Sequence, residues 1–156
     1  YVELKVEFLK RIHRAGKQIQ KFEAIRGDAV VQDYYSFSKS WLEPLRTHLA
    51  KKNTVYIFSG DAKLRELLNT MHDLGYYRSS LLIWVKNRVW LCRKDFYTQH
   101  ELIVYGWYGA HSYYGGRDKT VLFYPKPSKS ALHPTMKPPA LLRRLIYHSA
   151  KQGEVV

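Results

Sequence analysis

The residues with the clearest potential for chemistry lie in residues 132–138, Leu-His-Pro-Thr-Met-Lys-Pro. Two prolines hold this segment extended, immediately before a leucine-rich stretch that is predicted to be a helix. An imidazole, a hydroxyl and a cation, on His133, Thr135 and Lys137, therefore lie beside a helix N-terminus, where free amides favour an anionic group. A ligand that bears a carboxylate could dock there, and a rigid loop that only starts the helix explains the same residues equally well.

Other kinds of active site find less support. The seven histidines include no i, i+4 pair and no ligand spacing with acidic residues, so we expect no metal site. No Gly-x-Ser-x-Gly elbow marks a serine nucleophile, and the glycines between residues 106 and 116 do not form a Gly-x-Gly-x-x-Gly phosphate cradle. The single cysteine, Cys92, excludes an internal disulfide, and we interpret it as a packed thiol.

The elements that must position these residues alternate between helices and strands. The sequence predicts a helix from the N-cap Asp33 to about Ala50 with a kink at Pro44, a strand over 54–59, a helix over 62–73, a left-handed Gly75, and a strand over 76–85. This alternation is typical of an open α/β sheet.

After Lys86 the pattern changes. Residues 87–128 hold no convincing helix, but they are rich in aromatic and basic residues and include strand candidates at 101–105 and 120–124. A last helix is predicted to begin at Pro139 and to end at Ser149, and residues 153–156 look like the start of a strand. We therefore expect one domain over residues 1–156, made of a basic helix over 1–23, an α/β core over 24–86 and 129–156, and a β-rich insertion over 87–128.

The charge of the chain indicates a polyanionic partner. Lys and Arg number 26 against 13 Asp and Glu, which gives a formal charge of +13, and 15% of the residues are aromatic. Cations that grip phosphates and rings that stack on bases are what nucleic-acid binding requires. The longest apolar runs have about five residues, whereas a membrane span needs ~20. No stretch resembles a signal peptide, so the expected location is cytoplasmic.

Several segments, in their order along the chain, resemble the permuted (beta-class) amino-group DNA methyltransferases of bacteria and phages. The segments that carry the resemblance are Ala-Ile-Arg-Gly-Asp at 24–28, Leu-Ile-Trp-Val-Lys-Asn at 82–87, Tyr-Thr-Gln-His-Glu-Leu-Ile-Val-Tyr-Gly-Trp at 97–107, His-Pro-Thr-Met-Lys-Pro at 133–138, and Gly-Glu-Val-Val at 153–156. Together they span roughly residues 24–156.

The resemblance implies an activity and a fold. The family transfers a methyl group from S-adenosylmethionine to adenine N6 or cytosine N4 in DNA, which implies an α/β, Rossmann-like methyltransferase fold with a β-rich target-recognition insertion. The printed sequence has neither the family's Pro-Pro-Tyr before Val2 nor its Phe-x-Gly-x-Gly loop after Val156. The chain therefore looks like an incomplete, interior portion of such an enzyme, and we expect no turnover from it in isolation.

The resemblance also implies roles for particular residues. The loop at 133–138 corresponds to the one that borders the cofactor's amino-acid end, so cofactor contacts are expected from His133, Pro134, Thr135 and Lys137. Tyr1 is a candidate remnant of the catalytic Pro-Pro-Tyr loop. The expected contacts to the target base and DNA are Trp84, Lys86, Asn87, Arg88, Arg93, Lys94, Arg117 and Lys119. His100 and Glu101 also match the family, and we interpret them as structural pins of the insertion.

Alternative functions remain open at this point. The expected partner is double-stranded DNA, adenine is favoured over cytosine, and the resemblance also admits a homodimer and a companion restriction nuclease. A non-catalytic nucleic-acid-binding module of the same fold, or an RNA methyltransferase, would share many of these features. The basic helix over 1–23 is explained by a solvated face, by contact with phosphates or by a membrane surface.

Overall fold

The structure is a computed structural model that describes residues 33–90, 95–127 and 136–156. Its elements are α2 (Tyr34–Leu45), β1 (Lys52–Asn53), β2 (Val55–Ser59), the 3-10 turn η1 (Asp61–Lys63), α3 (Leu64–Asp73), β3 (Tyr76–Trp90), β4 (Thr98–Tyr108), β5 (Ala110–His111), β6 (Val121–Phe123) and α4 (Pro139–Ser149). The predicted helix over 1–23 and the segment 24–28 lie outside the described residues. No helix of the described segments is long and apolar enough to cross a bilayer.

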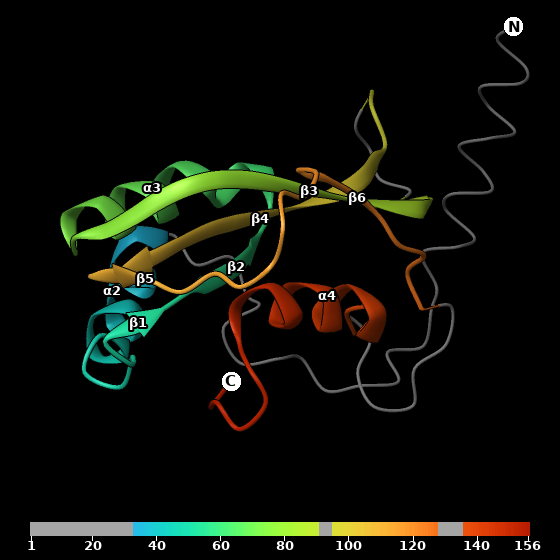
Figure 1. Ribbon diagram of the computed structural model, residues 1–156. Helices are drawn as coiled ribbons and strands as arrows, with labels where there is room; N and C mark the ends of the chain where they lie inside the picture. Colours follow the sequence, from blue (N-terminus) through green and yellow to red (C-terminus); the bar gives the residue numbers. More distant parts are fainter. Residues whose placement is uncertain (1–32, 91–94, 128–135) are drawn as a thin grey trace, which may run out of the picture.

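A four-stranded sheet forms the middle layer, in the order β2-β4-β3-β6. β4 runs antiparallel to both of its neighbours, so β2 and β3 run in the same direction, and β6 is parallel to β3. The connection between β2 and β3 contains α3, as expected for a crossover between parallel strands. The carboxyl ends of β2 and β3 therefore lie at the same edge of the sheet (Figure 1).

Each face of the sheet has its own apolar core, because successive side chains of a strand point to opposite faces. Val55 and Ile57 pack with α2 and α3, whereas Tyr56 and Phe58 pack with α4. Figure 1 shows α3 and α4 on opposite sides of the sheet. In β4, both Ile103 and Val104 are fully buried, one in each core, as expected for an interior strand.

β4 and β6 come from residues 87–128, which the sequence predicts to be an insertion. The expected boundary at residue 87 does not divide the sheet, since β3 continues to Trp90 and pairs there with Thr98. β4 then inserts between β2 and β3. The order of elements along the chain does not predict the position of β4 in the sheet, because the residues of a strand do not indicate which strands it pairs with. The assignment of this range to target recognition stays a prediction.

The predicted start of α2 is confirmed, whereas its predicted end is wrong. The Asp33 side chain caps the helix by accepting a hydrogen bond from the Ser36 amide at 2.9 Å. The helix ends at Leu45 rather than near Ala50, because Pro44 lies in its last turn and the following amides bond three residues back, such as Thr47 N to Pro44 O at 3.2 Å.

The predicted end of α3 at Asp73 and both predicted ends of α4 are confirmed, whereas α3 begins at Leu64 rather than at residue 62 and the last expected strand is absent. Gly75 follows α3 with a φ of 77°, and α4 begins at Pro139 and ends at Ser149. Residues 153–156 form no strand. Instead Glu154 closes a turn, accepting a hydrogen bond from the Lys151 amide at 2.8 Å and another from the Tyr114 hydroxyl at 3.0 Å.

Candidate functional site

The edge of the sheet where β2 and β3 end carries a group of charged side chains. In open α/β sheets, ligands bind at this edge, outside the carboxyl ends of the strands. Trp84 of β3 lies opposite Glu101 of β4, and Lys86 follows Trp84 by two positions, so all three project from one face. This is the face covered by α4.

Lys86, Glu101 and Lys137 form an ion cluster, which we call the lysine–glutamate cluster. Glu101 Oε1 lies 2.7 Å from Lys86 Nζ, and Glu101 Oε2 lies 2.6 Å from Lys137 Nζ. The side chains of Lys86, Lys137 and Glu101 are 11%, 26% and 25% exposed. The carboxylate thus joins β3, β4 and the segment that precedes α4, and each ammonium keeps donors for a further acceptor.

An aromatic floor lies beneath the cluster. Trp84 is fully buried, its indole NH donates to the Tyr124 carbonyl at 2.8 Å, and Phe58 meets it edge-on with centroids 6.4 Å apart. Lys86 Nζ lies 5.2 Å from the Trp84 ring centre, and Lys137 Nζ lies 5.2 Å from that of Phe58. Rings at this distance attract cations. Trp84, for which the resemblance implies a contact to the target base, is therefore buried in the core beneath the cluster.

The charges of the cluster determine the protonation of Glu101. Burial alone would raise its pKa, but the hydrogen bonds and charges of Lys137 and Lys86 outweigh burial, so the pKa of Glu101 lies below its ordinary value. The charges of the cluster also act on Lys126. Burial lowers the pKa of Lys126, and repulsion from Lys86 lowers it further.

The cluster is suited to hold an anionic group. With Glu101 ionised, two lysines and one carboxylate leave a local charge of +1, and Lys126 adds to it. A carboxylate or a phosphate is the ligand that partly buried ammonium groups bind. Within the described residues, no three His, Cys, Asp or Glu side chains are grouped so as to hold a metal ion.

Of the predicted site residues that the structure describes, four lie together at this edge. Lys86, Lys137 and Trp84 build the cluster and its floor, and Asn87 lies beside it, where its side-chain oxygen accepts a hydrogen bond from the Lys126 amide at 3.0 Å. Arg88 is exposed one residue further along β3. Tyr1, Arg93, Lys94, His133, Pro134 and Thr135 lie outside the described residues, so their roles stay predictions.

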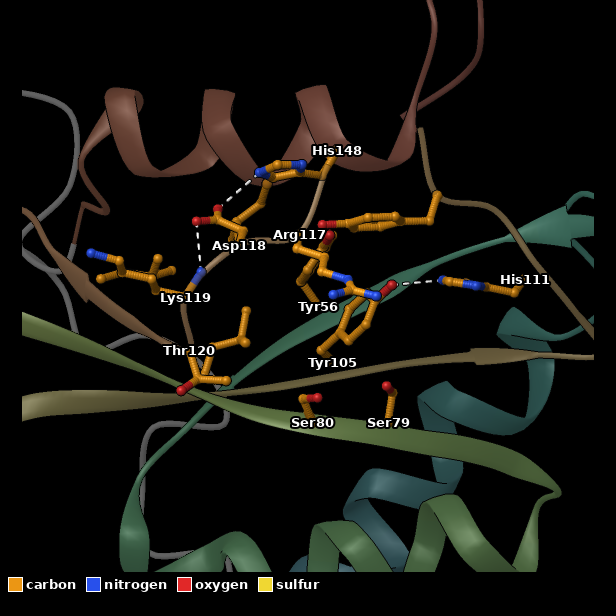
Figure 2. A pocket seen from close by; sticks show the side chains of 14 residues that line it. Tyr56, Ser79, Ser80, Tyr105, His111, Arg117, Asp118, Lys119, Thr120 and His148 are labelled. Carbon is orange, nitrogen blue, oxygen red and sulfur yellow. Dashed lines mark hydrogen bonds and ion pairs between the residues drawn. The ribbon is translucent and has the colours of Figure 1, made fainter. Parts of the chain in front are cut away.

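Arg117 and Lys119 lie elsewhere, at the other end of α4. They line a cavity of about 430 Å³ between the sheet, the carboxyl-terminal half of α4 and the segment at 111–120 (Figure 2). Lys137 precedes the first residue of α4, whereas His148, which also lines the cavity, is its penultimate residue. The predicted DNA contacts therefore fall into two groups, one beside the predicted cofactor contact Lys137 and one at this cavity.

Sequence reasoning missed the central role of Glu101, and it missed Phe58 and Lys126. Glu101 was expected to pin the insertion, but its carboxylate bonds to two predicted site lysines. The alternation of Glu101 with Ile103 and Tyr105 on one face of a strand was the available signal. No local signal indicates Phe58, because it reaches the cluster only through the pairing of β2 with β4.

Comparison with solved structures finds chains of similar fold. A crystal structure of the M1.HpyAVI–SAM complex matches with a TM-score of 0.59 at 17% sequence identity, covering 72% of this chain and 59% of that chain. Another crystal structure of M1.HpyAVI matches with a TM-score of 0.55 at 13% identity, covering 79% of this chain and 70% of that chain. Identities this low show the fold alone. Among curated proteins no match was found.

The family is shown by a separate comparison. The N6_N4_Mtase family model, described as DNA methylase, matches residues 8–156. This range contains all five motif segments and all of the described structure, and it confirms the resemblance to amino-group DNA methyltransferases and the α/β methyltransferase fold predicted from the segments. The chain spans 59% of the first solved structure that it matches. By this match over nearly its whole length, the chain belongs to the N6/N4 DNA methylase family.

Proposed function

We propose that this chain is part of an enzyme that transfers a methyl group from S-adenosylmethionine to an exocyclic amino group of double-stranded DNA, adenine N6 rather than cytosine N4. Membership of the DNA methylase family supports the reaction class. In this proposal the chain is an interior portion of a permuted enzyme, and the Pro-Pro-Tyr and Phe-x-Gly-x-Gly loops are supplied by other residues of the protein. Tyr1 then belongs to the first of these loops.

The observation that carries the proposal is the position of Lys137. It belongs to the segment that resembles the family's cofactor loop, and it lies 2.6 Å from Glu101 at the carboxyl edge of the sheet. The amino-acid end of S-adenosylmethionine bears a carboxylate and an ammonium group, and when bound the cofactor supplies an electrophilic methyl group. Two lysines and one carboxylate are complementary to that end, so Lys86 and Lys137 would hold the carboxylate and Glu101 the ammonium group.

The basic surface supports duplex DNA as the substrate. Arginines and lysines position a protein on DNA through the phosphates, and arginines also read guanine edges. Arg88, Arg117 and Lys119 are exposed, as such contacts require, and Arg93 and Lys94 stay in the proposal as predicted contacts. The indole of Trp84 is buried, and its contact to the target base stays a prediction.

Cofactor binding tests the role of the cluster. In the intact protein, Lys137→Met removes the ammonium group but keeps an unbranched side chain, and we expect S-adenosylmethionine to bind at least tenfold more weakly by calorimetry. Lys51→Met, at an exposed lysine outside the cluster, is the matched control. Equal affinity in the two variants would remove Lys137 from the cofactor site.

Product analysis tests the reaction. The intact protein is incubated with labelled cofactor and duplex DNA, and the digested nucleosides are separated by mass and retention. We expect N6-methyladenine, and we expect no product from residues 1–156 alone. DNA binding without methylation by the intact protein would favour the non-catalytic module instead.

A further inference from the structure

The cavity at the carboxyl-terminal half of α4 is a second built site, separate from the lysine–glutamate cluster. Eleven positions separate Lys137 from His148, which corresponds to about 16 Å along a helix. No residue of the cluster lines the cavity. Its volume of about 430 Å³ falls within the range of small-ligand pockets, about 300–1,000 Å³.

Aromatic rings form much of the cavity wall, and their orientation is already fixed. Tyr56 and Tyr105 stack with centroids 5.2 Å apart, and Tyr113 meets Tyr105 edge-on. The hydroxyls of these tyrosines bond to Ser149 Oγ at 2.7 Å, to His111 Nε2 at 2.6 Å and to the Gly116 carbonyl at 2.8 Å. Because the phenol groups are satisfied, the rings offer a ligand apolar faces and edges.

The outer wall of the cavity is attached firmly to α4. Asp118 accepts hydrogen bonds from Arg144 and from His148, and the His148 carbonyl accepts one from the Tyr114 amide at 2.7 Å. Figure 2 shows Asp118 and His148 facing each other beneath the helix. We call this contact of Asp118 with Arg144 and His148 the Asp118 bridge. It makes the wall a fixed part of the fold.

Polar groups without a protein partner face the same space. Ser79 and Ser80 lie on the floor and Thr120 at the side, and within the described residues their hydroxyls make no hydrogen bond (Figure 2). Arg117 extends across the mouth towards Tyr105, and it has no ion pair among the described residues. Since Asp118 is already paired with Arg144, Arg117 and Lys119 at the rim have no carboxylate partner in the part of the chain that the structure describes.

We propose that this cavity binds an unpaired nucleotide, with its base against the tyrosine rings and the hydroxyls and its phosphate on Arg117 and Lys119. A flat heteroaromatic base needs ring contacts together with a few hydrogen-bonding groups, and a phosphate needs cations at the rim. A purely apolar ligand would leave those cations unused, and a polyphosphate would leave the rings unused. The site is additional to the proposed cofactor and does not depend on methyl transfer.

Binding of dAMP to the intact protein tests the site, with deoxyadenosine as the ligand that lacks the phosphate. By calorimetry, Arg117→Gln should weaken dAMP binding about tenfold and leave deoxyadenosine binding unchanged. Thr120→Phe fills the cavity from an exposed position and should abolish binding of both ligands. Arg65→Gln makes the same change as the first variant, at an exposed arginine of α3 on the other face of the sheet, and should change neither.

Two comparisons identify the source of the nucleotide and the location of binding. A duplex with one bulged nucleotide that binds more tightly than the fully paired duplex, and loses this preference in Thr120→Phe, would identify DNA as the source, whereas dAMP binding alone would identify a free nucleotide. S-adenosylmethionine should not displace dAMP. Displacement by the cofactor, no binding of either probe, or unchanged dAMP affinity in Arg117→Gln would overturn the proposal. Each of these outcomes is independent of whether the protein methylates DNA.

Discussion

At each end of α4 a carboxylate bridges two other side chains, but the two bridges have different roles. At its start, Glu101 bridges Lys86 and Lys137, and at its end Asp118 bridges Arg144 and His148. In the first case the bridged lysines lie at the carboxyl edge of the sheet, where open α/β folds bind ligands. In the second, the bridged side chains Arg144 and His148 belong to α4 itself, and Arg117 and Lys119 stand apart at the rim of a cavity. A carboxylate that accepts hydrogen bonds from two side chains can therefore either form part of a charged site or attach a cavity wall to a helix.

The largest expected effect comes from replacing Trp84, which forms the floor of the lysine–glutamate cluster. Trp84→Ala removes a fully buried indole that supports both lysines, and we expect a loss of about 3–5 kcal/mol in the free energy of unfolding. Urea unfolding followed by circular dichroism measures it. Trp84→Phe retains a ring and should lose clearly less. A loss below about 1 kcal/mol for Trp84→Ala would mean that the cluster does not depend on its floor.

The second test concerns the cavity wall that is attached to the carboxyl-terminal half of α4. A Cβ on Gly115 would lie 1.6 Å from His148 Nδ1, so Gly115→Ala must displace the histidine or the wall. We expect a loss of about 1–3 kcal/mol, typical of overpacking, and weaker dAMP binding. The neighbouring Gly116→Ala is the matched control, because nothing lies within 4 Å of its added Cβ. Equal stabilities of the two variants would contradict a firmly attached wall.

The third test compares the two carboxylates by pH. Hydrogen bonds from Arg144 hold the pKa of Asp118 well below its ordinary 3.8, and the lysines hold that of Glu101 below 4.5. A lowered pKa in the folded state means stability that is present above the ordinary value and lost as the pH falls through the folded value. We expect the free energy of unfolding to fall below about pH 4.5.

Two neutral variants separate these contributions. Asp118→Asn should cost about 1 kcal/mol at pH 7, since the bridge is partly exposed, and should flatten the pH dependence more than Glu101→Gln does. The reason is that the pKa of Asp118 is lowered further. Urea titrations between pH 7 and pH 3 give the comparison, and the reverse order of slopes would show that the Asp118 bridge is the weaker of the two.

The smallest expected effect concerns one exposed arginine at each end, Arg88 and Arg117. If Arg88 contacts a phosphate, Arg88→Gln weakens binding of paired duplexes by a similar factor for every sequence and reduces the slope of log affinity against log salt by about 1. Arg117→Gln should affect the bulged duplex more than the paired one. Fluorescence anisotropy at several salt concentrations measures both. Identical effects on both duplexes would make Arg117 an ordinary backbone contact.

Local signals predicted the boundaries of elements correctly where a single residue fixes the backbone conformation. Proline begins α4, Asp33 caps α2 and Gly75 takes the left-handed conformation after α3, and each of these effects acts within one turn of the chain. Prediction was poorer where a partner distant in sequence decides. The contacts of Glu101 with two lysines were not predicted, because these lysines lie 15 and 36 positions away in the sequence.

The amino-acid sequence by itself determined the family, the alternation of helices and strands, and the presence of a charged segment before the last helix. These follow from residue types at short spacing, which act the same way in any surroundings. Only the tertiary structure decided that β4 lies between β2 and β3, that Trp84 is buried beneath the lysine–glutamate cluster, and that Arg117 and Lys119 rim a separate cavity. The physical reason is that strand pairing and side-chain packing join segments by hydrogen bonds and buried area, and neither is encoded in the order of neighbouring residues.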